Sequence, residues 1–490
     1  MDALTQARTL FLEAVEAQTA GDLAGAEVRL KAALVLAPGR ASILVNLAGV
    51  LLASGRPSEA ALLCNEALAG SPDNAQAWLN LALCRLDEDQ SEAALVAVDR
   101  ALALAPDDAA VRGNRGSILM QLGRVQEALQ AYDEAVALDD ADPAWHTARG
   151  TVLRVLERLP ESAAAHEAAL QRNPQDADAR WNRALVDLAL GNHEAGWAGF
   201  EWRWQASDPV RSNYSGRAPR WQGEPLAAGQ TLLVWAEQGL GDTVQFCRYA
   251  PLLAGKGLRV ILQVQAPLLR LLHGLDPRVR VIGPDDVLPE HDWHCPLLSL
   301  AGLCGTRRDS IPARTSYLAV PATVLEVWQA RLGERQRPRV GLMWQGNLQN
   351  RSGRGRSLPA AVLAPVMALP LDFFFVGKEA DPADLACLGR HGRLIDHSAV
   401  ITDFADTAAQ LSLMDLVLTI DTSVAHLSAA IGRPTWVLLG AGADWRWGLP
   451  GDTVAPWYPE TTRLFRQAPA EDWTRAVGEA AQALVQHFGS

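Results

Sequence analysis

The sequence predicts an α-helical solenoid followed by an α/β region that is divided into two lobes. Two observations support this prediction. The first half of the chain repeats a pattern with a period of 34 residues, whereas the chain from residue 230 onward alternates short apolar runs, glycine-containing turns and helical stretches. A repeat of this length indicates stacked helix pairs, and the alternation indicates parallel strands connected by helices.

Composition and charge restrict the class of protein. The 490-residue chain is 49% hydrophobic and 20% charged, which is typical of folded protein. Its net charge of −12 arises in residues 1–204, which contain 17 Lys and Arg against 29 Asp and Glu. An acidic solenoid is a poor nucleic-acid binder, so we expect no such partner. No apolar run approaches the ~18 residues of a membrane helix, and residues 1–12 lack a secretory pattern, so we expect a cytoplasmic protein without membrane insertion.

The repeats are defined by prolines and small residues at a constant spacing. A proline ends the second helix of each pair, and small residues lie where helices cross closely. One pair cannot bury its apolar face alone, so pairs stack. The prolines are Pro38, Pro72, Pro106 and Pro174, and one row of small residues is Ala26, Ala60, Ala94 and Ala128. The pattern resembles the tetratricopeptide repeat, with repeats at about 7–40, 41–74, 75–108, 109–142 and 143–176 and a degenerate sixth from 177 to about 205.

One repeat position is occupied by asparagine in four repeats. These residues are Asn46, Asn80, Asn114 and Asn182. Asparagine carries a donor and an acceptor, so a row of them can hold an extended peptide backbone. The row resembles the asparagine ladder in the groove of the O-GlcNAc transferase solenoid, which implies a protein or peptide acceptor. Asparagine also occurs at this position for local helix packing, and the sequence leaves both interpretations open.

The junction after the repeats is rich in aromatic residues. We interpret Trp197, Phe200, Trp202 and Trp204 as the last helix and a packing seam against the next domain, because aromatic side chains bury large areas. The predicted domains are the solenoid at 1–205, an N-terminal lobe at 206–325 and a C-terminal lobe at 326–490.

Each lobe contains several predicted buried strands. Those of the first lobe are 231–235, 258–264 and 279–282, with helices at 243–253 and 267–272. Those of the second lobe are 340–344, 373–376, 416–420 and 435–439, with a helix and linker at 321–337 and helices at 425–431 and 471–488. Two Rossmann-like lobes that face each other across a cleft form the GT-B architecture. Ligands bind beyond the carboxyl ends of the strands in such sheets.

The first candidate motif follows the strand at 231–235. It reads Gly239-Leu240-Gly241-Asp242, and its glycines permit a tight turn and close approach of the backbone. Asp242 is the candidate catalytic base, because a carboxylate at the cleft can accept the proton of an acceptor hydroxyl. Aspartate is equally a common N-cap, and capping lowers its pKa and weakens it as a base. The spacing leaves both roles open.

The second motif follows the strand at 416–420 and opens a helix. Asp421, Thr422 and Ser423 place hydroxyls and backbone N–H groups where a phosphate can dock, and His426 lies one turn further on. The alternative is a capped helix with a packed histidine.

A basic loop at 345–359 is the third motif. It contains Arg351, Arg354 and Arg356, which suit a diphosphate leaving group. A solvated charged loop is the alternative. A fourth candidate, Glu379 of Gly377-Lys378-Glu379, is placed to bind ribose hydroxyls. We expect the segment 444–467, rich in aromatic residues and arginine, to line the nucleotide pocket or to cross back to the first lobe.

Together these motifs resemble the bacterial heptosyltransferase-like glycosyltransferase family over about residues 228–470. The matching positions are Gly241-Asp242, Glu379, Arg356 where the family usually has lysine, and Asp421 to His426 with Ser423 where the family has glycine. The resemblance implies a metal-independent, inverting sugar transfer from a nucleotide-sugar held by the C-terminal lobe, with no cofactor.

The layout of the whole chain resembles bacterial tetratricopeptide glycosyltransferases, including flagellin-modifying ones, and O-GlcNAc transferase. That resemblance implies that the repeats deliver a protein acceptor to the cleft. Two alternatives remain open: a non-catalytic adaptor with a degenerate sugar-nucleotide-binding domain, and an enzyme acting on lipid-linked or polysaccharide acceptors.

Overall fold

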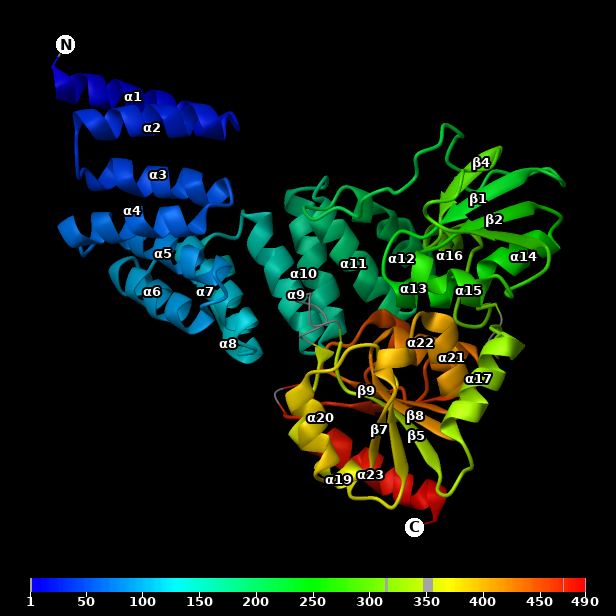
Figure 1. The fold of residues 1–490 in the computed structure, drawn as a ribbon. Coiled ribbons are helices and arrows are strands. Elements are labelled where there is room, and N and C mark those ends of the chain that lie inside the picture. Colours follow the sequence, from blue (N-terminus) through cyan, green and yellow to red (C-terminus); the bar gives the residue numbers. More distant parts are fainter. Residues whose placement is uncertain (1, 313–315, 347–355, 470, 490) are drawn as a thin grey trace. The chain divides into compact units, whose positions relative to one another are not determined.

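The computed structural model describes residues 2–312, 316–346, 356–469 and 471–489 (Figure 1). Contacts divide the chain into two compact units, Met1–Asp176 and Ala177–Ser490. In the described part of the chain, no helix is long and apolar enough to cross a membrane.

The first unit is a stack of five helix pairs. The pairs are α1 (Ala3–Thr19) with α2 (Leu23–Leu36), α3 (Ala41–Ala53) with α4 (Pro57–Gly70), α5 (Ala75–Asp87) with α6 (Ser91–Leu104), α7 (Ala109–Gln121) with α8 (Val125–Leu138), and α9 (Pro143–Val155) with α10 (Leu159–Arg172). The small residues that keep the 34-residue period are fully buried where the helices cross, as in Ala26, Ala60 and Ala94. The predicted helix pairs are therefore confirmed.

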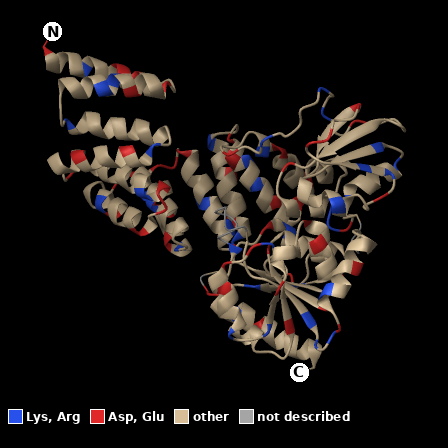
Figure 2. Cartoon of the chain, viewed as in Figure 1, with Lys and Arg blue, Asp and Glu red and all other residues tan. Residues whose placement is uncertain are grey.

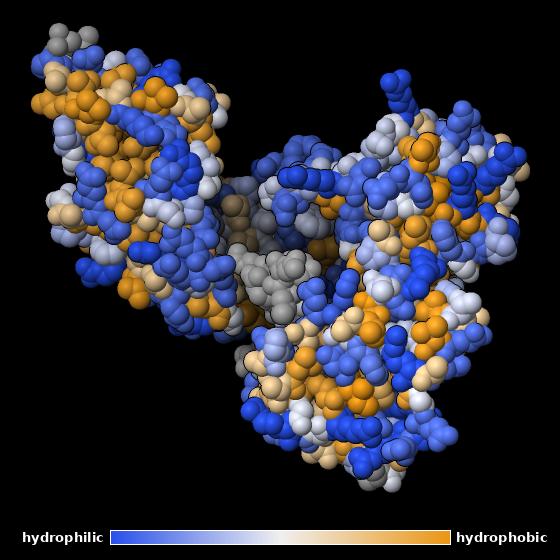
Figure 3. All heavy atoms as spheres, in the orientation of Figure 1, coloured by the Kyte–Doolittle hydropathy of each residue, from blue (hydrophilic) through white to orange (hydrophobic). Residues whose placement is uncertain are grey.

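The surface of this unit combines charged and apolar groups. Acidic and basic residues are interspersed along the repeats (Figure 2), and several of them pair, such as Arg56 with Glu27 at 2.8 Å. Figure 3 shows apolar side chains gathered on the N-terminal repeats. Val28, Leu62 and Val96 share one repeat position on the second helix of a pair and are 68%, 70% and 66% exposed. The first three repeats therefore present an apolar row.

The second unit begins with one further helix pair, α11 (Ala177–Leu190) and α12 (His193–Phe200), which ends in the 3₁₀ turn η1 (Glu201–Trp204). Trp197 and Phe200 are buried, and the Trp197 ring meets the Trp445 ring edge-on at 5.3 Å between centroids. The predicted packing seam is thus present. The compact units separate after Asp176 rather than near residue 205, because these aromatic side chains join the last helix pair to the α/β core.

The α/β region contains two fully parallel sheets. The first has the order β3-β2-β1-β4 and the second the order β10-β9-β8-β5-β6-β7. The strands are β1 (Thr231–Trp235), β2 (Arg259–Gln263), β3 (Val279–Ile282), β4 (Trp293–Pro296), β5 (Arg339–Met343), β6 (Asp372–Phe375), β7 (Leu394–Asp396), β8 (Leu416–Ile420), β9 (Thr435–Leu439) and β10 (Thr462–Arg466). The main helices are α13 (Leu240–Phe246), α14 (Tyr249–Gly255), α15 (Leu269–Leu272), α16 (Ser299–Leu303), α17 (Ala322–Leu332), α19 (Ala364–Met367), α20 (Pro382–Gly389), α21 (Phe404–Ser412), α22 (Ser423–Ala430) and α23 (Thr474–Phe488).

The structure differs from the predicted elements in two ways. Strands β4, β7 and β10 were not predicted, because each is short or carries proline, histidine or arginine instead of a continuous apolar run. The helix predicted at 243–253 is divided into α13 and α14 around Cys247 and Arg248. Arg248 is 2% exposed and donates to the backbone oxygens of Gln245 and Trp457, so tertiary contacts of this side chain accompany the break.

Both sheets reverse their strand order at a strand that precedes a candidate motif. In the first sheet, β1 lies between β2 and β4; in the second, β5 lies between β6 and β8. Loops on either side of such a switch point diverge and leave a crevice at the carboxyl ends of the strands. The motifs at 239–242, 346–356 and 421–426 therefore follow the strands at which each sheet forms its crevice.

Candidate functional site

A cavity of about 480 Å³ lies where these loops meet. It is lined by residues from both sheets: Gln238, Gly239, Leu240, Gly241 and Asp242 after β1, Gly346 and Arg356 after β5, Thr422, Ser423, His426 and Asp421 after β8, and Asp444 and Arg446 after β9. The structure thus brings together most of the residues that the sequence motifs singled out.

Asp242 is the third residue of α13, not the residue before the helix as its predicted N-cap position required. Its Oδ2 accepts a hydrogen bond from the Gly239 N–H at 3.0 Å, and its Oδ1 accepts from Arg446 Nη2 at 2.7 Å. The two interpretations of Asp242 are therefore compatible, because one oxygen orients the turn and the side chain still lines the cavity. In this state Arg446 therefore occupies Oδ1 of the candidate base.

Gly241 is the point at which the two motifs touch. A Cβ built on Gly241 would lie 3.0 Å from His426 Cδ2 and 3.2 Å from the Ser423 Cα. These distances are shorter than ordinary van der Waals contacts between carbon atoms. Glycine at this position therefore allows the start of α13 to approach the start of α22, which closes one side of the cavity.

Arg356 and Asp421 form an ion pair of 3.5 Å between Nη1 and Oδ2. Burial raises the pKa of Asp421, and the neighbouring Asp444 carboxylate adds to this rise, while Arg356 opposes it. Thr422 occupies the N-cap position of α22, which begins at Ser423, two residues earlier than predicted. The start of this helix places partial positive charge beside Arg356, which is the electrostatic arrangement that phosphate groups favour.

The His426 ring is buried in the wall of the site and is not present there as a cation. Its ring stacks on Trp447 at 5.0 Å between centroids, and its Nδ1 lies 3.0 Å from the Tyr458 hydroxyl. Burial lowers the pKa of His426 to about 3, and the positive charge of Arg446 acts in the same direction. The His426 ring is therefore neutral near pH 7 and contributes no positive charge to the cavity.

The depressed pKa of His426 predicts a stability that depends on pH. The unfolded chain binds a proton at this histidine below pH ~6.5, whereas the folded chain does so only near its own value of about 3. We therefore expect the free energy of unfolding to decrease as the pH is lowered through this range, by about 2 kcal/mol between pH 6.5 and pH 5. Urea unfolding followed by tryptophan fluorescence at several pH values tests this. His426→Gln should flatten the slope, the exposed His391→Gln should not, and equal slopes in all three proteins would contradict the assignment.

Two lining residues, Asp444 and Arg446, were not among the predicted site residues. Arg446 Nη1 donates to Asp444 Oδ1 at 2.8 Å, so this arginine is shared by carboxylates from both sheets. Burial disfavours its charge, but Asp444 and Asp242 more than offset this and hold the pKa of Arg446 above its ordinary value. The signal in the sequence is the segment 444–467, rich in aromatic residues and arginine, which was predicted to line the pocket or to cross back to the first lobe.

Two of the predicted donor-binding residues are not placed in the cavity. Glu379 follows β6, is exposed and does not line the cavity, and its backbone oxygen accepts from Gln345 Nε2 at 2.6 Å. Its proposed contact with a ribose stays a prediction. Arg354 lies outside the described residues.

The four asparagines of the row differ in their burial and in their hydrogen-bond partners. Asn46, Asn114 and Asn182 are half-buried, and each donates from Nδ2 to the carbonyl four residues earlier in its own helix. Asn80 is 6% exposed, and its Nδ2 donates to the Val45 oxygen of the preceding repeat at 3.0 Å. Asn80 therefore serves repeat packing, contrary to its predicted place on an open groove, while groove binding by the other three stays a prediction.

This difference predicts unequal effects of alanine. Asn80→Ala should lower the free energy of unfolding by about 1–3 kcal/mol, because it removes buried hydrogen bonds. Asn114→Ala should change it by no more than about 0.5 kcal/mol. Thermal unfolding of both variants measures this, and equal melting temperatures would show that Asn80 is not a packing residue.

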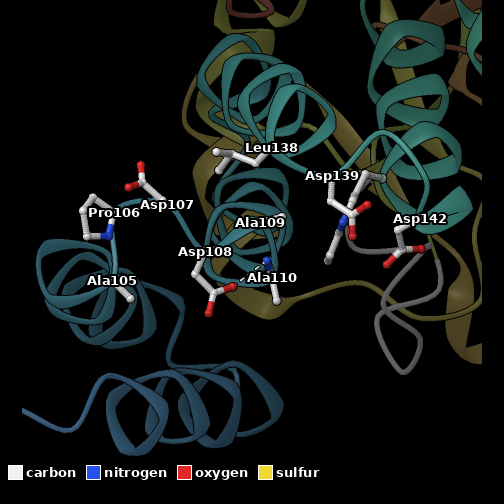
Figure 4. A pocket seen from close by; sticks show the side chains of 10 residues that line it. Ala105, Pro106, Asp107, Asp108, Ala109, Ala110, Leu138, Asp139 and Asp142 are labelled. Atoms are coloured by element: carbon white, nitrogen blue, oxygen red, sulfur yellow. Dashed lines mark hydrogen bonds between the residues drawn. The ribbon is translucent and has the colours of Figure 1, made fainter.

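A separate cavity of about 770 Å³ lies among the inter-helix loops of the first unit (Figure 4). It is lined by Asp107, Asp108, Asp139 and Asp142 together with Trp145. Asp108 and Asp142 cap the starts of α7 and α9 by accepting backbone N–H bonds. Helix capping therefore accounts for two of these four carboxylates.

A third cavity, of about 720 Å³, lies in the second unit between α12 and α16. Its walls include Trp197, Trp221 and the ion pair of Glu201 with Arg220. The indole N–H groups of Trp197 and Trp221 already donate to the backbone oxygens of Thr306 and Glu224. Although this cavity is larger than the one at the switch points, it contains none of the motif residues after β1, β5 and β8.

Family models match the first part of the chain. Models described as tetratricopeptide repeat match residues 51–113 and 85–151, and residues 11–75 and 147–197. The chain is similar to Protein FlbA of Caulobacter vibrioides (strain ATCC 19089 / CIP 103742 / CB 15), with 26% identity over 339 residues; the match covers 64% of this chain and 56% of that relative's length.

The solved structures to which the chain is similar include two repeat proteins. A thermophilic TPR protein of Thermus thermophilus is 23% identical, with a TM-score of 0.35, and the match covers 37% of this chain and 99% of that one. A tetratricopeptide repeat protein of Parabacteroides merdae ATCC 43184 is 22% identical, with a TM-score of 0.35, and the match covers 42% of this chain and 82% of that one. From its helix pairs, its 34-residue period and the matching repeat models, the N-terminal region of the chain consists of tetratricopeptide repeats.

Proposed function

We propose that the protein is an inverting, metal-independent glycosyltransferase that moves a sugar from a nucleotide-sugar to a protein acceptor recruited by the repeats. One observation carries the proposal: Asp242 from one sheet and Arg356 with the turn at Asp421 from the other line a single cavity at the switch points of both sheets. A candidate base and a candidate anion-binding turn are therefore within reach of one substrate.

Each group has a chemical role in this proposal. Asp242 accepts the proton of the acceptor hydroxyl as the oxygen attacks the anomeric carbon. Arg356 and the start of α22 stabilise the charge that develops on the departing nucleoside diphosphate, which is the task of preorganised donors in a partly buried site. His426 contributes an uncharged ring to the wall of the cavity. Tetratricopeptide repeats bind proteins or peptides, so the acceptor class proposed is a protein.

The test is sugar addition to a protein in cells. Candidate acceptors, including flagellins, are co-expressed with the chain and analysed by intact mass. The proposal requires a mass increase equal to a glycosyl residue that appears only when the chain is present. If no candidate gains such a mass and no nucleotide-sugar is consumed by the purified chain, the chain is not a glycosyltransferase of this kind.

The alternative is a non-catalytic repeat adaptor with a degenerate sugar-nucleotide-binding domain. It is favoured by the ion pair that occupies Asp242 and by the position of Glu379 outside the cavity. Thermal unfolding with UDP, GDP, ADP and CDP separates the two. Stabilisation by a nucleotide that is lost in Arg356→Gln supports the transferase site, whereas stabilisation by none of them favours the adaptor.

A further inference from the structure

Arg446 holds an unusual position in the cavity because it joins carboxylates that belong to different sheets. Its Nη2 donates to Asp242 Oδ1 at 2.7 Å, and its Nη1 donates to Asp444 Oδ1 at 2.8 Å. The side chain is 10% exposed, and its guanidinium carbon lies 4.6 Å from the centre of the Trp445 ring. The guanidinium is thus fixed by packing and by Asp444 even without Asp242.

The guanidinium still has donor capacity. Within the described part of the chain, Arg446 Nε is buried and makes no hydrogen bond. A buried donor without a partner costs free energy, and a ligand that supplies an acceptor recovers that cost. Arg446 lines the same cavity as Arg356, so an anion with two phosphate groups can contact both arginines there.

The charges that line the cavity explain why the existing ion pairs oppose the binding of such an anion. Asp242, Asp421 and Asp444 contribute three carboxylates against the two guanidiniums of Arg356 and Arg446. Each arginine is already paired with a carboxylate, Arg356 with Asp421 and Arg446 with Asp242. A diphosphate therefore competes with these carboxylates for the two arginines.

We infer that Arg446 is an exchangeable partner of Asp242: in the empty site it neutralises the carboxylate, and a bound diphosphate takes over its guanidinium and leaves Asp242 free to act as the base. The inference rests on the proposed function and specifies how its base becomes available. The Gly239 N–H continues to hold Oδ2 after the exchange, so the carboxylate keeps its orientation while Oδ1 becomes available.

The transfer step balances under this arrangement. The acceptor oxygen forms a bond to the anomeric carbon, the bond from that carbon to the diphosphate oxygen breaks, and its electron pair leaves with the nucleoside diphosphate. The acceptor proton passes to Asp242 Oδ1, and the negative charge released on the diphosphate faces Arg446 and Arg356. The same arginine thus serves the carboxylate before the ligand binds and the leaving group afterwards.

Inorganic pyrophosphate is a suitable probe, because the exchange depends on the diphosphate and not on the sugar or base. Its affinity for the full chain is measured by calorimetry in wild type, Asp242→Asn, Arg446→Gln and the double variant. We expect Asp242→Asn to tighten binding about ten-fold by removing the competitor, and to have less than about a two-fold effect in the Arg446→Gln background, a coupling within the range that contacting groups show.

Asp421→Asn is the matched control, because it removes the same charge from the same cavity but is paired with Arg356. Asp421 interacts with Arg446 through its charge but is ion-paired with Arg356, so its effect should depend on Arg446→Gln much less than the effect of Asp242→Asn does. If Asp242→Asn tightens binding equally in both backgrounds, the gain is a general charge effect and the exchange is refuted.

The outcomes also separate the inference from the proposed function. Wild-type binding without coupling between Asp242 and Arg446 overturns only the exchange, whereas no pyrophosphate binding at millimolar concentration overturns the proposed donor site together with it. Near-ultraviolet circular dichroism checks that each variant is folded. Should Arg446→Gln fail to fold, Arg446→Lys replaces it, because lysine keeps the charge but cannot serve several acceptors in one plane.

Discussion

Replacing Asp242 with asparagine is expected to slow sugar transfer by a factor of about 10²–10⁴, the usual contribution of a general base. Asparagine has nearly the same shape and keeps an oxygen that can accept the Gly239 N–H, but it cannot take up the acceptor proton. The measurement is the rate of glycosyl mass gain on the acceptor by intact-mass analysis under conditions in which wild type is not saturated.

The control is Asp472→Asn, since Asp472 also accepts a backbone N–H near the start of a helix, α23, but lies outside the cavity. It should transfer sugar at the wild-type rate. Melting temperatures of both variants show whether loss of the Arg446 ion pair has changed the fold. An undiminished rate for Asp242→Asn in a folded protein would remove Asp242 from the role of base.

Replacing Glu237 with alanine is expected to lower the free energy of unfolding of the second unit by about 3–5 kcal/mol. Glu237 follows β1, and its oxygens accept from Arg203 Nη2 at 2.9 Å and from the Leu298 N–H at 2.9 Å. Both charged side chains are fully buried. Alanine leaves the Arg203 guanidinium in the core with part of its hydrogen bonding unsatisfied, which is the costly way to break such a pair.

Urea unfolding followed by tryptophan fluorescence measures this loss, because Trp204 lies against the Arg203 guanidinium at 4.5 Å. Glu471→Ala breaks a half-exposed ion pair with Arg475 and should cost no more than about 1 kcal/mol. The double change Arg203→Met with Glu237→Leu should recover much of the stability, because it removes both charges. A cost below about 1 kcal/mol for Glu237→Ala would show that the buried pair does not hold this part of the fold.

The sequence predicted the helix pairs well because one physical rule repeats every 34 residues. Burial of small residues such as Ala60 and Ala94 at helix crossings is visible as a period, and no long-range information is needed. The central strands β1, β5 and β8 were predicted for a similar reason, since strands covered on both faces are continuous apolar runs. Edge strands β7 and β10 lack that signal.

The site was predicted less completely than the fold. Asp242, Asp421 and His426 were found because each follows a recognisable strand, and the structure places all three along one cavity. Arg446 was not singled out, because its importance depends on a contact with Asp242 across 204 positions of sequence. Asn80 was grouped with Asn46 because the two share a repeat position, and the sequence left groove binding and packing open; its neighbours in space decide in favour of packing.

The boundary after Asp176 has a practical consequence for building chimaeras of this protein. A chimaera in which residues 1–176 are replaced by other repeats should be joined before Ala177, at the boundary of the two compact units. Joining it at residue 205 would carry Trp197 and Phe200 away with the old module and leave the Trp445 ring uncovered. The sixth helix pair should therefore be kept with the α/β region, and the five pairs before it form the part that can be replaced.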